Sequence, residues 1–94
     1  MRETEMSHKL ICFVPDSESN LQNQMLDLIA HINVTHPDIN AEVLDISDSR
    51  YSRYIRKQGV YPVFLILKND TRKTTMYGKI SKEDLCSWVI ASLG

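Results

Sequence analysis

The sequence predicts an α/β domain with the element order β-α-β-α-β-β-α, in which a four-stranded mixed sheet carries helices on both faces. Two observations predict this class. Short apolar runs, typical of buried strands, alternate with segments whose apolar residues recur every three or four positions, as in amphipathic helices. The last two apolar runs are separated only by a turn at Asn69 and Asp70, which favours an antiparallel hairpin.

The first half of the chain is expected to form a strand, a long helix and a second strand. Residues 9–14 are a continuous apolar run that ends at Pro15, as in a strand buried on both faces. Helix-capping residues then precede an amphipathic helix over residues 17–35. Residues 39–46 form the next strand, and a right-handed crossover makes the two strands parallel. The inward positions of the helix are Leu21, Met25, Leu28, Ile29 and Ile32.

The second half predicts a short helix, a hairpin and a closing helix. Ser47, Asp48 and Ser49 precede the short helix, which extends to residue 58. Strands follow over residues 60–67 and 71–77. Ser81 to Asp84 then resembles a capping box. The residues expected to face inward are Tyr51, Tyr54 and Ile55 in the short helix, and Leu85, Trp88, Val89 and Leu93 in the closing helix.

The composition is that of one ordinary soluble domain. The 94 residues are 43% hydrophobic and 24% charged. No apolar run approaches the ~20 residues that span a bilayer. The polar residues 1–8 lack the apolar stretch of a signal peptide, so we expect a flexible N-terminal segment, a domain over residues 9–94 and a cytoplasmic location.

The net charge of −1 conceals an asymmetry between the two halves of the chain. Residues 1–48 carry nine acidic and two basic side chains, a balance of −7, whereas residues 49–94 carry three acidic and nine basic ones, a balance of +6. Such a split marks an interaction surface, or it is partly neutralised because the two halves interleave in the fold. The sequence leaves both interpretations open.

Two cysteines and three histidines are the candidates for redox or metal chemistry. Cys12 and Cys86 lie 74 positions apart, which excludes a C-x-x-C motif and a local zinc knuckle. His8, His31 and His36 share no metal-ligand spacing, so neither a metal nor a cofactor is expected. Both cysteines are expected to be small buried hydrophobes, with a thiol-linked redox role for Cys12 or Cys86 as the alternative.

The second half of the chain resembles thioredoxin. The segment A-E-V-L-D-I at residues 41–46, then a helix, then G-V-Y-P-V-F-L-I at residues 59–66 is similar to a strand ending in Asp, a helix and a "G-[IV]-x-P-T" turn. The K-N-D hairpin at residues 68–70, Tyr77-Gly78 and the closing helix are also similar. The resemblance covers residues 9–93 and implies a minimal thioredoxin-like fold of the thioredoxin/glutaredoxin type.

The resemblance fails at the position where thioredoxins carry their active-site cysteines. That position falls on Asp16, Ser17, Glu18 and Ser19. Disulfide exchange needs an attacking thiolate and a resolving thiol, which serine hydroxyls do not provide. The matching proline of thioredoxins is cis and lies beside the cysteines, so the resemblance implies a cis bond before Pro62. Because the cysteines are missing from this position, we expect a redox-inactive protein that is not an enzyme.

What the resemblance retains is the groove in which thioredoxins hold an extended peptide. The partner is then another protein or an extended peptide. Some superfamily members without the cysteine pair are binding partners, among them the cyanobacterial clock protein B and the sensor domain of its cognate kinase. Residues 13–21 and 45–66 are somewhat similar to these, whereas the hairpin through Tyr77 is more similar to ordinary thioredoxin. The residues expected at the groove are Asp16, Ser17, Glu18, Ser19, Tyr61 and Pro62.

A basic helix offers an alternative function. Arginines interleave with Tyr51 and Tyr54 over residues 50–57, a pattern that suits phosphates and stacked bases. The same pattern arises when the tyrosines pack inward and the basic side chains face solvent. The negative net charge makes nucleic acid the less expected partner. The basic residues of this alternative are Arg50, Arg53, Arg56 and Lys57.

Overall fold

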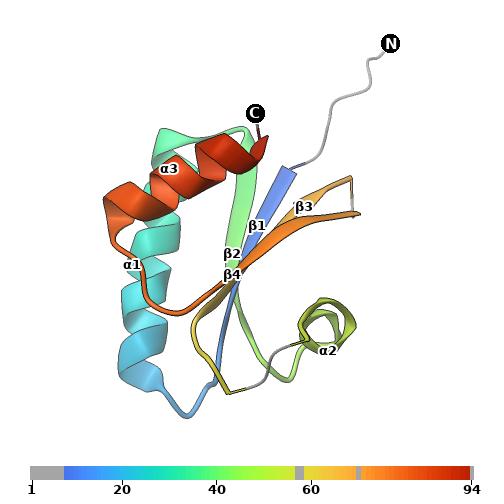
Figure 1. Cartoon of the computed structure of the whole chain (residues 1–94). Coiled ribbons are helices and arrows are strands. Elements are labelled where there is room, and N and C mark those ends of the chain that lie inside the picture. Colours follow the sequence, from blue (N-terminus) through green and yellow to red (C-terminus); the bar gives the residue numbers. More distant parts are fainter. Residues whose placement is uncertain (1–7, 57–58, 70, 94) are drawn as a thin grey trace.

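In the part of the chain that the structure describes, four strands and three helices follow one another in the predicted order (Figure 1). The computed structural model of the chain describes residues 8–56, 59–69 and 71–93. The expected N-terminal segment lies outside these residues except for His8, which begins the first strand. The elements are β1 (His8–Val14), α1 (Ser19–Thr35), β2 (Ile39–Asp45), α2 (Ser49–Tyr54), β3 (Val63–Lys68), β4 (Thr71–Tyr77) and α3 (Lys82–Leu93).

The strands form one mixed sheet in the order β2-β1-β3-β4. β1 runs parallel to β2 and antiparallel to β3, and β3 and β4 form the predicted hairpin. Phe13, near the end of β1, lies opposite Leu44 of β2 and opposite Val63 at the start of β3. The loops that follow β1 and β2 and the loop that precedes β3 therefore meet at one end of the sheet, which we call the site end.

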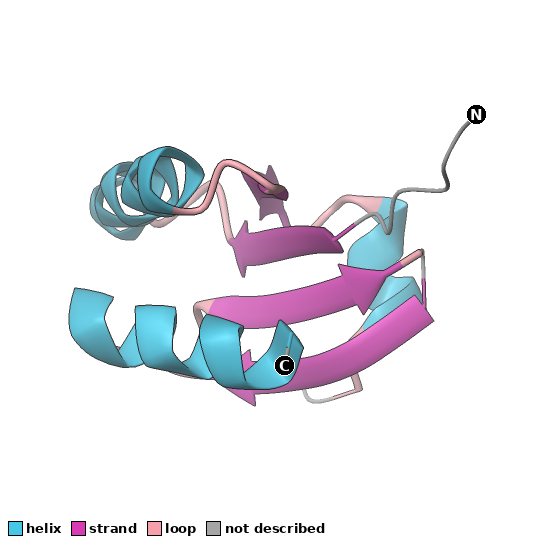
Figure 2. Cartoon of the chain, turned by 90° about the horizontal axis from the view of Figure 1, so that it is seen from above, coloured by secondary structure: helices cyan, strands magenta, loops and turns pink. Residues whose placement is uncertain are grey.

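Helices cover both faces of the sheet (Figure 2). Alternate residues of β1 point to opposite faces, because side chains alternate along a strand. Cys12 belongs to the core beneath α1 and α3, whereas Phe13 belongs to the core beneath α2. The central strands are buried on both faces, as their continuous apolar runs predicted. No helix in the described part of the chain is long and apolar enough to cross a membrane.

Two helices differ in length from the sequence-based prediction. α1 begins at Ser19 rather than at residue 17, because the chain first makes a turn in which the Glu18 amide donates to the Pro15 carbonyl at 3.0 Å. Its N-cap residue, Glu18, makes no side-chain cap, so the expected capping by this polar cluster is wrong. α2 ends at Tyr54, because Ile55 turns to an extended conformation and buries its side chain against the sheet.

The other two helix starts are capped as the sequence predicted. The Asp48 carboxylate accepts a hydrogen bond from the Arg50 amide at the start of α2, at 2.9 Å. The Ser81 hydroxyl accepts one from the Asp84 amide at the start of α3, at 3.1 Å.

β3 starts at Val63 rather than at residue 60, directly after Pro62. A proline has no amide hydrogen to donate to a sheet ladder, so the strand begins beyond it.

The two oppositely charged halves of the chain do not interleave. Residues before α2 supply β1, β2 and α1, whereas residues after it supply β3, β4 and α3. The acidic half therefore supplies the two strands that end at the β2 edge of the sheet, and the basic half supplies the two strands that end at the opposite, β4 edge. The strand order excludes interleaving of the strands, although Arg50 of the second half does neutralise charge on Asp48 and Glu42 of the first. The charge asymmetry of the sequence becomes an asymmetry in space.

The closing helix packs through only some of the side chains that were expected to face inward. Leu85 and Val89 are fully buried, as predicted. Trp88 is only half-buried and meets the buried Phe64 edge-on, with ring centroids 6.5 Å apart. The expectation of a buried tryptophan is wrong, because Leu85 and Val89 occupy the centre of the helix-sheet contact and Trp88 covers its margin.

We expect the two aromatic residues of this contact to differ in their effect on stability. Phe64→Ala leaves a cavity in a closed core and should lower the free energy of unfolding by about 3–5 kcal/mol. Trp88→Ala removes a ring that is still partly in water, so its cost should be about 2 kcal/mol. Urea denaturation of both variants measures the difference. A larger loss for Trp88→Ala would contradict this packing.

Candidate functional site

The candidate site residues come from two loops that meet at the site end of the sheet. Asp16, Ser17 and Glu18 follow β1, and Ser19 is the first residue of α1. Tyr61 and Pro62 directly precede β3. Because the end of β1 pairs with the start of β3, the strand register brings the two loops to adjacent positions. Figure 1 shows both at the lower end of the sheet.

The first loop is exposed but anchored. Asp16, Ser17, Glu18 and Ser19 are all exposed to solvent. Their backbone is tied to the neighbouring strand, because the Asp16 amide donates to Asp45 Oδ1 at 2.7 Å. Two hydroxyls and two carboxylates are therefore offered to solvent on an anchored turn.

Asp45, at the end of β2, is a further residue at this end of the sheet that the sequence did not single out. It joins the turn after β1 to the loop after β2. Its Oδ2 accepts a hydrogen bond from the Ser47 amide at 3.0 Å, while its Oδ1 holds Asp16. Hydrogen bonding from Ser47, with a smaller contribution from the Asp16 amide, holds the pKa of Asp45 below its ordinary value of 3.8. Asp45 is thus a positioning residue. The sequence signal for it was an Asp at the end of a strand, followed by serines.

The second loop is fixed by Pro62. The Tyr61–Pro62 peptide bond is cis, and the proline is fully buried. The Pro62 carbonyl accepts a hydrogen bond from the Gly78 amide at 2.8 Å, which connects this loop to the end of β4. Gly78 adopts a φ of +97°, a conformation that favours glycine. Tyr61 itself is half-buried, so part of its ring is available at the surface.

A buried tyrosine supports Tyr61 from beneath. The Tyr51 and Tyr61 rings lie 6.5 Å apart, and Tyr51 in turn meets Phe13 edge-on at 5.3 Å. The Tyr51 hydroxyl is buried and has no hydrogen-bond partner among the described residues. Burial, and then the nearby Tyr61 phenol, raise the pKa of Tyr51 to about 12, so it stays neutral. This aromatic column holds the exposed ring in place.

The candidate site lies on the exposed surface of the molecule. The described residues enclose no pocket at the site end or elsewhere. Half-buried Tyr61 packs against both cores. The groove expected at this end of the sheet therefore stays a prediction, and the strand register brings the two loops expected to line it together.

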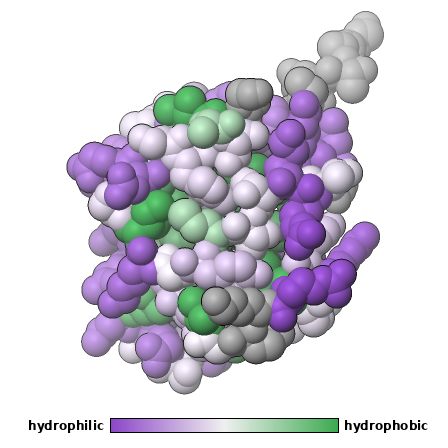
Figure 3. All heavy atoms as spheres, viewed as in Figure 1, coloured by the Kyte–Doolittle hydropathy of each residue, from purple (hydrophilic) through white to green (hydrophobic). Residues whose placement is uncertain are grey.

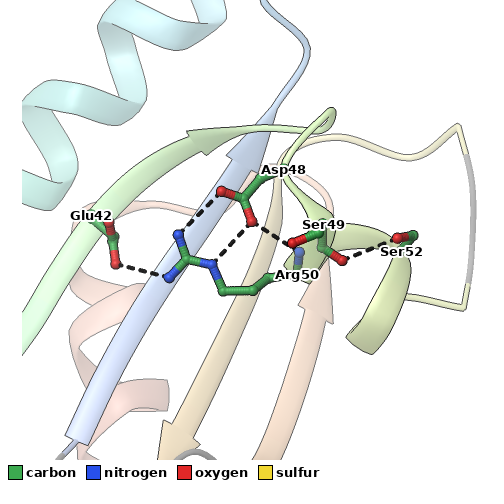
Figure 4. Close-up of polar contacts among 5 residues, drawn as sticks. All are labelled: Glu42, Asp48, Ser49, Arg50 and Ser52. Atoms are coloured by element: carbon green, nitrogen blue, oxygen red, sulfur yellow. Dashed lines mark hydrogen bonds and ion pairs between the residues drawn. The ribbon is translucent and has the colours of Figure 1, made fainter.

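The alternative basic site is divided by the structure. Arg50 lies between two acids, with Nε 3.0 Å from Asp48 Oδ1 and Nη1 3.6 Å from Glu42 Oε2 (Figure 4). These contacts raise the pKa of Arg50 and lower that of Asp48. Arg53 lies over the Tyr54 ring at 5.3 Å, Arg56 is exposed beyond the end of α2, and Lys57 lies outside the described residues. Arg50 is therefore occupied within the molecule.

The two cysteines are separate from the site. Cys12 is fully buried in β1, and burial raises the pKa of its thiol far above the ordinary value. Cys86 lies half-buried on α3 at the edge of the same core, and neither cysteine forms a disulfide. A thiol in an apolar core is protonated and a poor nucleophile. Within the described ranges, no three His, Cys, Asp or Glu side chains are grouped to hold a metal ion.

Comparison with solved structures identifies the fold as thioredoxin-like. Thioredoxin-2 of the malaria parasite superposes with a TM-score of 0.66 at 14% identity, covering 95% of this chain and 86% of that one. Thioredoxin O2 of Arabidopsis thaliana gives 0.65 at 17%, covering 90% and 74%. Thioredoxin 1 of Thermosipho africanus gives 0.64 at 20%, covering 90% and 93%. No protein-family model and no curated protein sequence matches the chain.

The anchoring role of Asp45 predicts its acid titration. Because its pKa in the folded protein is lowered, the anchoring is complete above the ordinary pKa and is lost as the pH falls below it. We expect the Asp45 carboxyl carbon to titrate below 3.8, with the Asp16 and Ser47 amide resonances following the same curve, in carbon-13 and proton NMR. In Asp45→Asn those amides should not titrate with this midpoint. An Asp45 midpoint at or above 3.8 would contradict the assignment.

Proposed function

We propose that this protein is a redox-inactive thioredoxin-like interaction module that binds a partner protein or an extended peptide at the site end of its sheet. One observation carries the proposal. An anchored, solvent-exposed turn without a thiol lies next to a half-exposed tyrosine, Tyr61, whose position is fixed by the buried Pro62.

The chemistry of the described side chains supports redox inactivity. At the turn, Ser17 and Ser19 stand where dithiol exchange would need a thiolate and a resolving thiol. The thiolate form of Cys12 is suppressed by burial, and Cys86 projects from α3, a different element from the site loops. Thioredoxins with the same fold have identities of 20% or less to this chain, so their activity does not transfer to it.

The arrangement of the second loop supports recognition of an extended chain. Tyr61 precedes Val63, the first residue of the β3 ladder, so its backbone groups lie outside the sheet pairing. An extended peptide is often recognised by main-chain hydrogen bonds, with side-chain contacts adding specificity. The Tyr61 ring, held from beneath by Tyr51, is a rigid aromatic surface of the kind that dominates binding energy at interfaces. Asp16 and Glu18 add negative charge beside it.

We expect no disulfide reductase activity. Reduction of insulin by dithiothreitol, followed by turbidity, should proceed at the same rate with and without the protein. The Cys12→Ala and Cys86→Ala variants should match the wild type. Catalysis by the wild type that disappears in one of these variants would instead assign a redox role to that cysteine.

Binding should depend on Tyr61. Peptides selected from a displayed library of random sequences for binding to the wild type should bind Tyr61→Ala at least about tenfold more weakly, because the aromatic anchor is lost. Tyr54→Ala is the matched control, since Tyr54 is also half-buried but lies on α2. N-methylation of the peptide backbone should also weaken binding. Selected peptides that bind Tyr61→Ala and Tyr54→Ala equally well would contradict the proposal.

A further inference from the structure

We propose that the basic side of this domain docks onto the acidic side of a second copy, so that the protein associates head to tail through its two sheet edges. The proposal concerns surfaces distinct from the site end and does not depend on the proposed function. It rests on the spatial separation of charge, on the pairing of opposite charges where the two halves meet, and on the relative direction of the two edge strands.

The basic side is built from the β4 edge and the end of α2. Arg72 in β4 reaches across to α2, where its Nη1 donates to the Tyr54 carbonyl at 3.2 Å. Arg53 lies over the Tyr54 ring, and Lys73 is exposed beside Arg72. Figure 3 shows strongly hydrophilic side chains along this side of the molecule, over the β3–β4 hairpin and α2. Arg53 and Arg72 thus both contact Tyr54, and Lys73 adds a third exposed cation on the β4 edge.

The acidic side is built from β2, the loop before it and the outer face of α1. Asp38 is exposed directly before β2, Glu42 lies on the strand, and Asp27 is exposed on α1, which packs over β2. Asp16, Glu18 and Asp45 continue the negative charge toward the site end. The nearest basic side chain from the same half of the chain, among the described residues, is Lys9 on the central strand β1.

Among the described residues, opposite charges pair only where the two halves meet. Arg50, at the start of α2, bridges Asp48 and Glu42. Among the described residues no other ion pair lies within 4.0 Å, so Arg53, Arg72 and Lys73 have no acidic partner in this part of the chain. The fold thus neutralises charge at the boundary and leaves opposite charges on its two outer edges.

The direction of the strands makes these edges complementary between copies. β2 and β4 both run parallel to β1. A second copy that is shifted within the plane of the sheet, perpendicular to the strands and without rotation, therefore places its β2 beside β4 of the first copy. Glu42 and Arg72 both lie on the face that α2 covers, since each contacts a residue of α2. The same displacement therefore brings positive and negative side chains together on one face.

The contact is expected to be between side chains rather than a continued sheet. The pairing of β3 with β4 shifts in register between Ile66 and Leu67, whose partners are Thr74 and Arg72, so Lys73 is left out of the pairing, as in a bulge. Bulges and charged side chains on an edge strand obstruct further strand pairing. A long polyanion is a poorer occupant of the basic edge, because the net charge is −1 and the acidic side would repel it. A second copy supplies compensating charge on an edge strand that runs in the same direction.

Sedimentation equilibrium at several salt concentrations tests the proposal. At about 20 mM salt and high protein concentration, the weight-average mass should rise well above the 10.8 kDa of one chain. At about 300 mM salt the association constant should fall at least about tenfold, because exposed charges are screened. A mass that stays at 10.8 kDa at low salt would overturn the proposal, and so would association that is insensitive to salt.

Charge reversal identifies the two surfaces. Arg72→Glu with Lys73→Glu makes the basic edge acidic, and Asp38→Lys with Asn40→Lys makes the acidic edge basic while leaving the Arg50–Glu42 pair in place. Each double variant alone should be monomeric at low salt, and an equimolar mixture of the two should associate again. The mixture controls for changes in net charge, and far-ultraviolet circular dichroism checks that each variant is folded. Association of either variant alone, or none in the mixture, would overturn the proposal.

Discussion

The structure depends on the antiparallel pairing of two central strands that are each buried on both faces. Residues 10–14 of β1 and 63–67 of β3 are all buried and alternate between two cores, one under α1 and α3 and one under α2. A shift of register by one residue would exchange every side chain between the two cores. Since the cores hold different helices, the pairing of Phe13 with Val63 is strongly specified.

That pairing also creates the site. β1 ends where β3 begins, so the turn after β1 and the loop before β3 meet without any direct bond between them. Each loop is then held separately, the first by Asp45 of β2 and the second by the amide that Gly78, after β4, donates to Pro62. All four strands thus contribute to one exposed surface, and its anchors are polar contacts that leave the outward-facing side chains available.

The same strand order separates the charges of the molecule. Because β1 and β2 come from the first half of the chain and β3 and β4 from the second, each half keeps its own edge of the sheet. α2 alone crosses between them, with Arg50 toward Glu42 of β2 at its start and Tyr54 toward Arg72 of β4 at its end. The fold therefore gives a nearly neutral protein two edges of opposite charge, and none of the described charged residues is buried.

The sequence by itself determined the element order, the parallel and antiparallel pairs and most of the core, because hydrophobic periodicity and turn residues act locally. Through the resemblance to thioredoxins it also predicted that Ser17 and Ser19 stand where a dithiol would lie. Only the tertiary structure decided that Trp88 covers the margin of a core, that Arg50 is held by acids, that Asp45 anchors the site and that the charged halves stay apart. Each depends on which strands become neighbours, and strand pairing joins residues far apart in the chain, beyond the reach of any local pattern.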